Sequence, residues 1–95
     1  MWVSGFNIML EIQKTANYRF QYQKLNSRFR RFIDDAVEAI KESPIEYQNK
    51  ITLIGIRKEG GLYRFRMPGC HLLFLVSSNE HNVPCLVILN NIKLL

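Results

Sequence analysis

Three residues near the middle of the chain have types and a spacing that suit phosphate chemistry. Arg64 and Arg66 alternate with apolar residues, and His71 follows them after a Pro68-Gly69 turn signal. If a hairpin is symmetric about this turn, Arg66 lies opposite His71, and directly opposed side chains share one face of a sheet. The alternation puts Arg64 on that face as well. The sequence therefore predicts a cationic cluster, which a slip of one residue in register would break.

Such a cluster could cleave RNA by attack of a 2′-hydroxyl on the neighbouring phosphate. The reaction needs a proton acceptor, a proton donor and stabilisation of a charged, phosphorane-like transition state. Guanidinium groups bind phosphates in a bidentate manner and stabilise such charge. A histidine that titrates near neutrality can act as the base or the acid. Three further basic residues could help to position the RNA: Arg57, Lys58 and Lys93.

The same residues also have a plainer interpretation, which the residues alone slightly favour. Arg64 and Arg66 could be the solvent-facing side of an ordinary strand, with His71 a neighbour that transfers no proton. Leu73 and Leu75 share the parity of His71, so the cationic face turns apolar further along. This pattern suits either a groove edge or a central strand that another segment covers.

The sequence offers no other familiar catalytic motif. It contains no Gly-rich phosphate loop, no paired-histidine metal helix and no serine elbow. Its two histidines and two cysteines lack the spacing of metal ligands, so we expect neither a metal nor a cofactor. His81 falls in a polar turn segment and is expected to be incidental. The formal charge of +5 suits an anionic partner such as nucleic acid.

The length and the apolar runs limit the class of protein. Residues 1–95 are enough for one domain and leave no room for a second. The N-terminus lacks the basic region and the long apolar run of a signal peptide, and the longest apolar runs have only the length of a strand. We therefore expect a cytoplasmic protein with reduced cysteines and no membrane partner.

The N-terminal half shows two different periods. Alternation over residues 6–12 predicts a first strand. Apolar residues at steps of three and four then predict two amphipathic helices, roughly 15–25 and 28–42, with Ser27 as the N-cap of the second. Residues 45–59 fit either a short strand or an extended connection.

The C-terminal half is expected to be strands. The hairpin strands 63–67 and 70–76 are followed by a final strand from Cys85 to about Asn90. We predict an α+β fold in which two N-terminal helices pack on a small, mostly antiparallel sheet, in the order β-α-α-β-β-β.

Over roughly residues 8–93 the chain resembles the RelE/ParE superfamily of bacterial toxins from type II toxin–antitoxin pairs. Residues 22–27, Tyr-Gln-Lys-Leu-Asn-Ser, and residues 39–44, Ala-Ile-Lys-Glu-Ser-Pro, are similar to the end of the family's first helix and to its second helix. Residues 61–69, Gly-Leu-Tyr-Arg-Phe-Arg-Met-Pro-Gly, resemble its hairpin with alternating basic residues. The resemblance implies a compact toxin fold and a cognate antitoxin encoded beside the toxin.

In the RelE branch, the resemblance also implies cleavage of messenger RNA in the ribosomal A site by a cluster of basic residues. Arg64 and Arg66 fall on two basic positions of that cluster, and Lys93 lies near the position of a further arginine. His71 falls where the branch usually has an arginine. The family's C-terminal tail, with a His-Arg pair and a tyrosine, has no counterpart here, which leaves a weakened or inactive relative as a further expectation.

From these observations the sequence predicts a RelE-like toxin that acts as a ribosome-dependent mRNA endoribonuclease and inhibits translation. Arg64 and Arg66 would hold the scissile phosphate, and His71 would transfer the proton. Two alternatives stay open. One is a ParE-like inhibitor of DNA gyrase that acts without catalysis, and the other is a catalytically degenerate toxin fold that serves as a protein-interaction domain.

Overall fold

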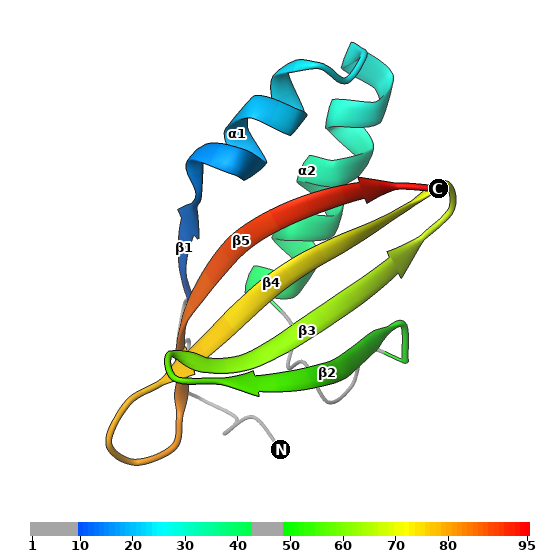
Figure 1. Cartoon of the computed structure of the whole chain (residues 1–95). Coiled ribbons are helices and arrows are strands. Elements are labelled where there is room, and N and C mark those ends of the chain that lie inside the picture. The colour runs from blue at the N-terminus through cyan, green and yellow to red at the C-terminus, as the bar shows by residue number, and fades with distance from the viewer. Residues whose placement is uncertain (1–9, 43–48) are drawn as a thin grey trace.

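The computed structural model of the chain describes residues 10–42 and 49–95 and has the predicted α+β architecture (Figure 1). In chain order the elements are β1 (Glu11–Lys14), α1 (Ala16–Gln23), α2 (Ser27–Glu42), β2 (Ile51–Arg57), β3 (Gly60–Met67), β4 (Cys70–Ser78) and β5 (Pro84–Leu94). No helix in the described ranges is long and apolar enough to cross a membrane.

The strands form one sheet with the order β1-β5-β4-β3-β2. Strands β2 to β5 pair in an antiparallel manner, and β1 pairs with β5 in parallel. The mostly antiparallel sheet is therefore confirmed. Because β4 lies in the centre and β3 and β5 flank it, the predicted hairpin is built into the middle of the sheet and is held from both sides.

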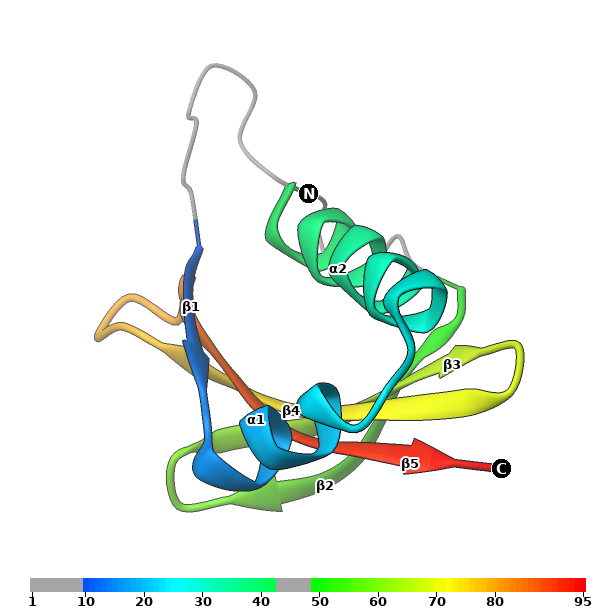
Figure 2. The same cartoon turned by 90° about the horizontal axis from the view of Figure 1, so that it is seen from above.

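Helix α2 lies across one face of the sheet, behind it in Figure 1 and above it in Figure 2, and α1 packs against β5. Ile33 and Ile40 of α2 are fully buried against inward-facing strand residues. The members of this core from β3, β4 and β5 are Phe65, Met67, Cys70, Leu72, Phe74, Val76, Val87, Leu89 and Ile92. We call the opposite side of the sheet the open face; it carries Arg64, Arg66, His71, Leu73 and Lys93.

Side-chain caps set where the helices begin. Thr15 caps α1 by accepting a hydrogen bond from the backbone N–H of Tyr18 at 3.1 Å. Asn26, and not the predicted Ser27, caps α2, because its Oδ1 accepts from the N–H of Phe29 at 2.8 Å. Ser27 is already the first helical residue. Both asparagine and serine are good N-caps, so composition alone could not choose between them.

Two strand boundaries differ from the predictions. The first strand is described only over Glu11–Lys14, and residues 6–9 of the predicted 6–12 lie outside the described residues. The last strand runs to Leu94 and so continues past the predicted end at Asn90. The ambiguous segment before the hairpin forms a true strand, β2, which makes the sheet five-stranded.

Candidate nucleic-acid interface

The hairpin register brings three basic side chains into one row across the open face. Arg66 pairs with His71 between β3 and β4, and His71 pairs with Lys93 between β4 and β5. The predicted symmetric register is confirmed, since Met67 also pairs with Cys70 across the turn. Arg66 and Lys93 are exposed and His71 is half-buried, so the row presents two free cationic tips beside a partly sheltered imidazole.

The turn that sets this register is tight and tied down. Gly69 has φ = 84°, a conformation that glycine adopts without steric cost. Its carbonyl oxygen accepts a hydrogen bond from the backbone N–H of Leu95 at 3.1 Å. The turn after β3 and the end of β5 therefore lie side by side, as Figure 1 shows. This contact holds together the end of the sheet that carries Arg66 and Lys93.

Arg64 lies one row further from the turn, on the same face. It pairs with Thr52 of β2 and with Leu73 of β4. The side chain is half-buried, and its Nε is fully covered without a hydrogen-bond partner. The buried Nε is a donor without an acceptor among the described residues, whereas the rest of the half-buried side chain lies on the open face.

A bulge in β5 turns Lys93 onto the open face. Leu73 pairs with Asn91, whereas the next residue, Phe74, pairs with Leu89, so Asn90 is an extra residue in the ladder. Beyond the bulge the alternation is inverted. Ile92 therefore points into the core, and Lys93 joins His71 on the open face.

Helix α1 holds this bulge in place. The Thr15 hydroxyl donates to the carbonyl oxygen of Asn90 at 3.1 Å, and Asn17 Nδ2 donates to the same oxygen at 3.4 Å. On the other side of the bulge, the N–H of Ile92 donates to Oε1 of Gln21 at 2.7 Å. Backbone groups that the bulge removes from the ladder are thus satisfied by side chains of α1, which fixes the position of the row.

Arg57 and Lys58 lie at the other end of the hairpin and are not brought together with the row. Arg57 pairs with Gly60 at the turn between β2 and β3. Arg66 lies six residue steps after Gly60, which is about 20 Å along β3. Arg57 and Lys58 line a separate pocket of ≈ 560 Å³, together with Tyr63 and residues of the loop after β4.

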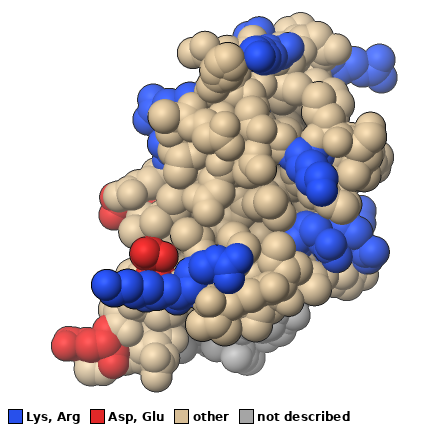
Figure 3. Space-filling view, in the orientation of Figure 1, with Lys and Arg blue, Asp and Glu red and all other residues tan. Residues whose placement is uncertain are grey.

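The open face is electropositive at the row and has its acidic side chains elsewhere. Figure 3 views this face, with basic side chains along its right side, at the top, at the upper left and across the lower part, and with acidic side chains only along the left. Within residues 10–42 and 49–95, no carboxylate forms an ion pair with Arg64, Arg66 or Lys93. The ion pair that these residues do contain joins His81 to Glu80, away from the row. The positive charge of the row favours an anionic ligand.

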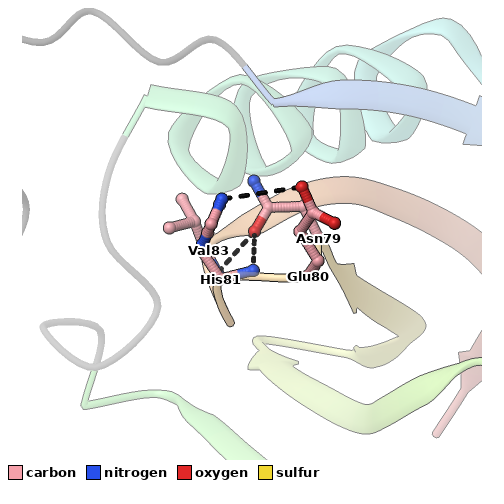
Figure 4. A network of polar contacts seen from close by, with 4 residues as sticks. All are labelled: Asn79, Glu80, His81 and Val83. Carbon is pink, nitrogen blue, oxygen red and sulfur yellow. Dashed lines mark hydrogen bonds and ion pairs between the residues drawn. The ribbon is translucent and has the colours of Figure 1, made fainter.

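His81 plays no part in this cluster. It lies in the loop between β4 and β5, where Asn79 Oδ1 accepts from the N–H groups of His81 and Val83 at 2.9 and 3.1 Å (Figure 4). The imidazole is exposed and lies 3.6 Å from Glu80. This loop is at the opposite end of β4 from His71. Among the described residues, no three His, Cys, Asp or Glu side chains come close enough to hold a metal ion.

A pocket beside Arg66 contains residues that the sequence analysis did not single out. It has a volume of ≈ 260 Å³ and lies between α2 and the end of β3. Phe32 and Asp35 of α2 line it, together with Lys50 and Arg66. The sequence feature that could have identified Phe32 is its position outside the apolar stripe of the helix, because a large aromatic residue away from the buried face is exposed.

The geometry can be compared with known proteins. No protein-family model and no curated protein matches the sequence. Among solved structures, the chain is similar to the crystal structure of an archaeal RelE–RelB complex from Pyrococcus horikoshii OT3. The TM-score is 0.71 with 13% sequence identity, and the match covers 90% of this chain and 94% of the other. The chain has a RelE-like fold. The predicted resemblance is thus confirmed at the level of the fold.

Within this RelE-like fold, the basic row has the parts that a phosphate site requires. Two guanidinium groups, Arg64 and Arg66, occupy neighbouring rows of β3 on one rigid face, and the His71 imidazole lies directly across from Arg66. Charged donors on a rigid sheet stabilise developing negative charge without reorganisation. The roles of Arg64, Arg66, His71 and Lys93 in catalysis or RNA binding stay predictions.

Proposed function

We propose that the chain is the toxin of a type II toxin–antitoxin pair and acts as a RelE-like, ribosome-dependent mRNA endoribonuclease that inhibits translation. The observation that carries the proposal is the row of Arg66, His71 and Lys93, with Arg64 beside it, on the open face of a RelE-like fold. The register places basic groups and one titratable group together, as 2′-hydroxyl attack on phosphorus would need.

In this proposal the two arginines hold the scissile phosphate. Arg64 and Arg66 donate to its non-bridging oxygens and stabilise their growing charge as the 2′-oxygen bonds to phosphorus and the 5′-oxygen leaves. His71 accepts the proton of the 2′-hydroxyl or gives one to the 5′-oxygen. Lys93 beside it positions the RNA backbone, and Arg57 and Lys58 contact RNA about 20 Å further along the sheet.

The site supports dependence on the ribosome for a chemical reason. The cleavage moves two protons, and His71 is the one imidazole in the described part of the row. The second proton and the alignment of the substrate must then come from elsewhere, and a ribosome-bound message supplies both order and nearby groups. An isolated protein with this site is therefore expected to cut free RNA poorly.

The proposal includes a protein antitoxin as partner, as the similar archaeal structure is a complex of RelE with RelB. Several exposed apolar side chains could be covered by such a partner, among them Phe20, Leu94 and Leu95. Co-expression with the product of a small adjoining gene, followed by co-purification, tests this part. Failure of any neighbouring product to bind would contradict it.

The decisive experiment is translation of a reporter message in a cell-free bacterial system with the purified protein, with primer extension to map new 5′ ends. We expect cuts within translated codons that disappear in the double variant Arg64→Ala/Arg66→Ala. A matched control is Arg28→Ala/Arg31→Ala, which removes two exposed arginines from α2 and leaves the open face intact. The control is expected to cut like the unchanged protein.

Other outcomes would favour the other classes of function. An intact message with normal protein synthesis contradicts the nuclease, and a DNA supercoiling assay with gyrase then tests a ParE-like inhibitor. Blocked synthesis with an intact message indicates a ribosome binder that does not cut. No effect in either assay favours a degenerate fold that serves as a protein-interaction domain.

A further inference from the structure

The pocket between α2 and the end of β3 opens directly beside the basic row. Arg66 belongs to both, since it pairs with His71 on the sheet and also lines the pocket. Past the pairing of Ile51 with Phe65, the N–H of Arg66 donates to the carbonyl oxygen of Lys50 at 3.0 Å, so the end of β3 stays joined to the turn before β2. Arg66 thus connects the open face to the pocket at this edge.

The pocket has an apolar interior and a charged rim. Phe65 and Met67, which are buried core residues, lie at its base, and Phe32 forms a wall. Phe32 is 41% exposed, although it is a large aromatic residue. Asp35, one turn along α2, contributes a carboxylate, and Lys50 contributes an ammonium group. This combination of aromatic surface with one acceptor and two cationic donors is typical of sites for small planar polar molecules.

The Phe32 ring is positioned before any ligand arrives. It packs edge to face on Phe29, with ring centroids 6.1 Å apart and an interplanar angle of 72°. Phe29 in turn lies over the turn of the basic row, since a Cβ at Gly69 would be 3.8 Å from its Cζ. The turn that carries the row and the aromatic wall of the pocket are therefore packed together as one unit.

We propose that this pocket binds a nucleobase, and specifically guanine, of the nucleotide beside the phosphate that Arg66 holds. This inference rests on the proposed function and adds its base specificity. Phe32 stacks on the base, as aromatic side chains do on unstacked bases of single-stranded RNA. Asp35 reads the edge of the base, and Lys50 contacts its oxygen or its phosphate.

Guanine fits the pocket because it presents donors and acceptors in the matching places. Its N1–H and N2–H₂ groups can both donate to one carboxylate, here that of Asp35. Its O6 and N7 accept from cationic side chains, and Arg66 and Lys50 both line the pocket. Adenine offers no donor at N1, and pyrimidines have less surface for Phe32 to stack on, so both should bind less tightly.

The first test needs no cleavage activity. Binding of the four nucleoside 5′-monophosphates to the purified full chain is measured by amide NMR titration. We expect GMP to bind most tightly and to shift the amide signals of residues 32–36 and 65–67. Phe32→Ala should weaken GMP binding at least about fivefold through lost stacking. Asp35→Asn should remove the preference of GMP over AMP. Equal binding of GMP to the unchanged protein and to both variants would overturn the proposal.

Matched controls separate the pocket from general effects of charge and hydrophobicity. Phe20→Ala removes an exposed phenylalanine from α1, with 53% of its surface exposed against 41% for Phe32. Glu38→Gln neutralises an exposed carboxylate of α2 that does not line the pocket. Both controls should bind GMP like the unchanged protein. A loss of binding in Phe20→Ala equal to that in Phe32→Ala would count against a specific stacking site.

The second test uses the mapped cleavage sites in translated messages. We expect guanine to be enriched at one position next to the cut, and Asp35→Asn to abolish this enrichment. Cleavage with an unchanged base distribution in Asp35→Asn and Phe32→Ala would overturn the pocket and leave the nuclease standing. Absence of any cleavage, together with GMP binding that depends on Phe32, would overturn the nuclease and support the pocket as a nucleotide site.

Discussion

The buried hydroxyl group of Tyr18 is expected to lower the free energy of unfolding. Tyr18 is 1% exposed, and its oxygen is buried without a hydrogen-bond partner. Burial, and then the negative charge of Asp34, raise the pKa of this phenol well above its usual value. The hydroxyl of the neighbouring Tyr22 does have a partner, because it donates to Asp34 Oδ2 at 2.7 Å.

Removing one oxygen from each tyrosine should therefore have opposite effects. Tyr18→Phe deletes an unsatisfied hydroxyl and keeps the stacked ring, so we expect the free energy of unfolding to rise by about 1 kcal/mol. Tyr22→Phe loses a made hydrogen bond and should lower it by a few tenths to about 1 kcal/mol. Urea denaturation followed by circular dichroism measures both, and equal effects would show that Tyr18 has a partner in solution.

Alkaline pH should act through the same residue. Because the pKa of Tyr18 is higher in the folded chain than in the unfolded chain, folding favours the protonated phenol. Its contribution is fully present below the ordinary pKa of about 10 and is lost as the pH rises above it. Thermal unfolding between pH 8 and pH 11 should thus show an advantage of Tyr18→Phe that grows above pH 10. A constant advantage would contradict this linkage.

His71 allows charge and proton transfer to be told apart within the proposed reaction. His71→Gln keeps a polar side chain but cannot move a proton, so we expect codon cleavage to slow by about 10²–10⁴-fold while RNA binding changes little. His71→Arg places a permanent charge opposite Arg66 and provides no general acid or base. Full cleavage by His71→Arg would show that the position supplies charge alone. Primer extension over a time course gives the rates.

Among the elements, the turn between β2 and β3 is the least tolerant of change. Gly60 has φ = 146°, and a Cβ there would lie 2.1 Å from the carbonyl oxygen of Val76. Gly55 in the adjacent strand has room, since its nearest neighbour would be the flexible guanidinium of Arg57 at 3.0 Å. The two glycines of one hairpin thus differ in what they require.

Alanine at these two glycines should separate backbone strain from loss of flexibility. Gly60→Ala is expected to destabilise the fold by about 3 kcal/mol, since it combines a strained φ with a backbone clash. Gly55→Ala should change the stability by less than about 1 kcal/mol. Equilibrium unfolding in urea compares them. Similar losses for both would mean that the turn between β2 and β3 adapts to the added methyl group.

How far the sequence predicts each strand depends on whether its alternation is unbroken. Tyr63, Phe65 and Met67 alternate without interruption, so the hairpin register, and with it the pairing of Arg66 with His71, could be predicted. In β2 the register shifts between Leu53 and Gly55, which puts Ile54 out of phase and explains why this segment looked ambiguous.

The predicted site was incomplete for the same kind of reason. A period of two or of 3.6 residues shows which side chains share a face, but not which faces of different elements meet at an edge. Phe32 and Lys50 are 18 positions apart in the chain. The packing of α2 on the sheet brings Phe32 to the pocket, and the backbone hydrogen bond from Arg66 to Lys50 brings Lys50 there. Arg57 and Lys58 were grouped with the row by charge, whereas β3 separates them from it along its length.

For the whole molecule, we expect the edge of the sheet at β2 to influence self-association in solution. Strand β2 lies at the end of the strand order and pairs only with β3 among the described strands. It carries three exposed apolar side chains: Leu53, Ile54 and Ile56, which are 50%, 43% and 72% exposed. An unpaired apolar edge strand is a template for pairing with another chain.

A charge on this edge should keep the purified chain monomeric to higher concentration. Ile56→Lys replaces the most exposed of the three residues and should reduce self-association, while it changes stability by no more than about 0.5 kcal/mol. Size-exclusion chromatography with light scattering over a concentration series measures the effect. Phe20→Lys is the control, because Phe20 is 53% exposed on a helix. An equal improvement from Phe20→Lys would point to general hydrophobicity in place of edge pairing.

The extra residue at Asn90 also matters for any comparison of this chain with distant relatives. Before it, odd-numbered residues of β5 face the core, and after it even-numbered residues do. In a relative without the extra residue, the residue aligned with Lys93 would point into the core, even where the two sequences align without a gap. Residues after the bulge should therefore be matched to those of a relative by structure, starting from Ile92, whose N–H donates to Gln21. A sequence alignment that runs through the bulge without a gap would match the wrong residues.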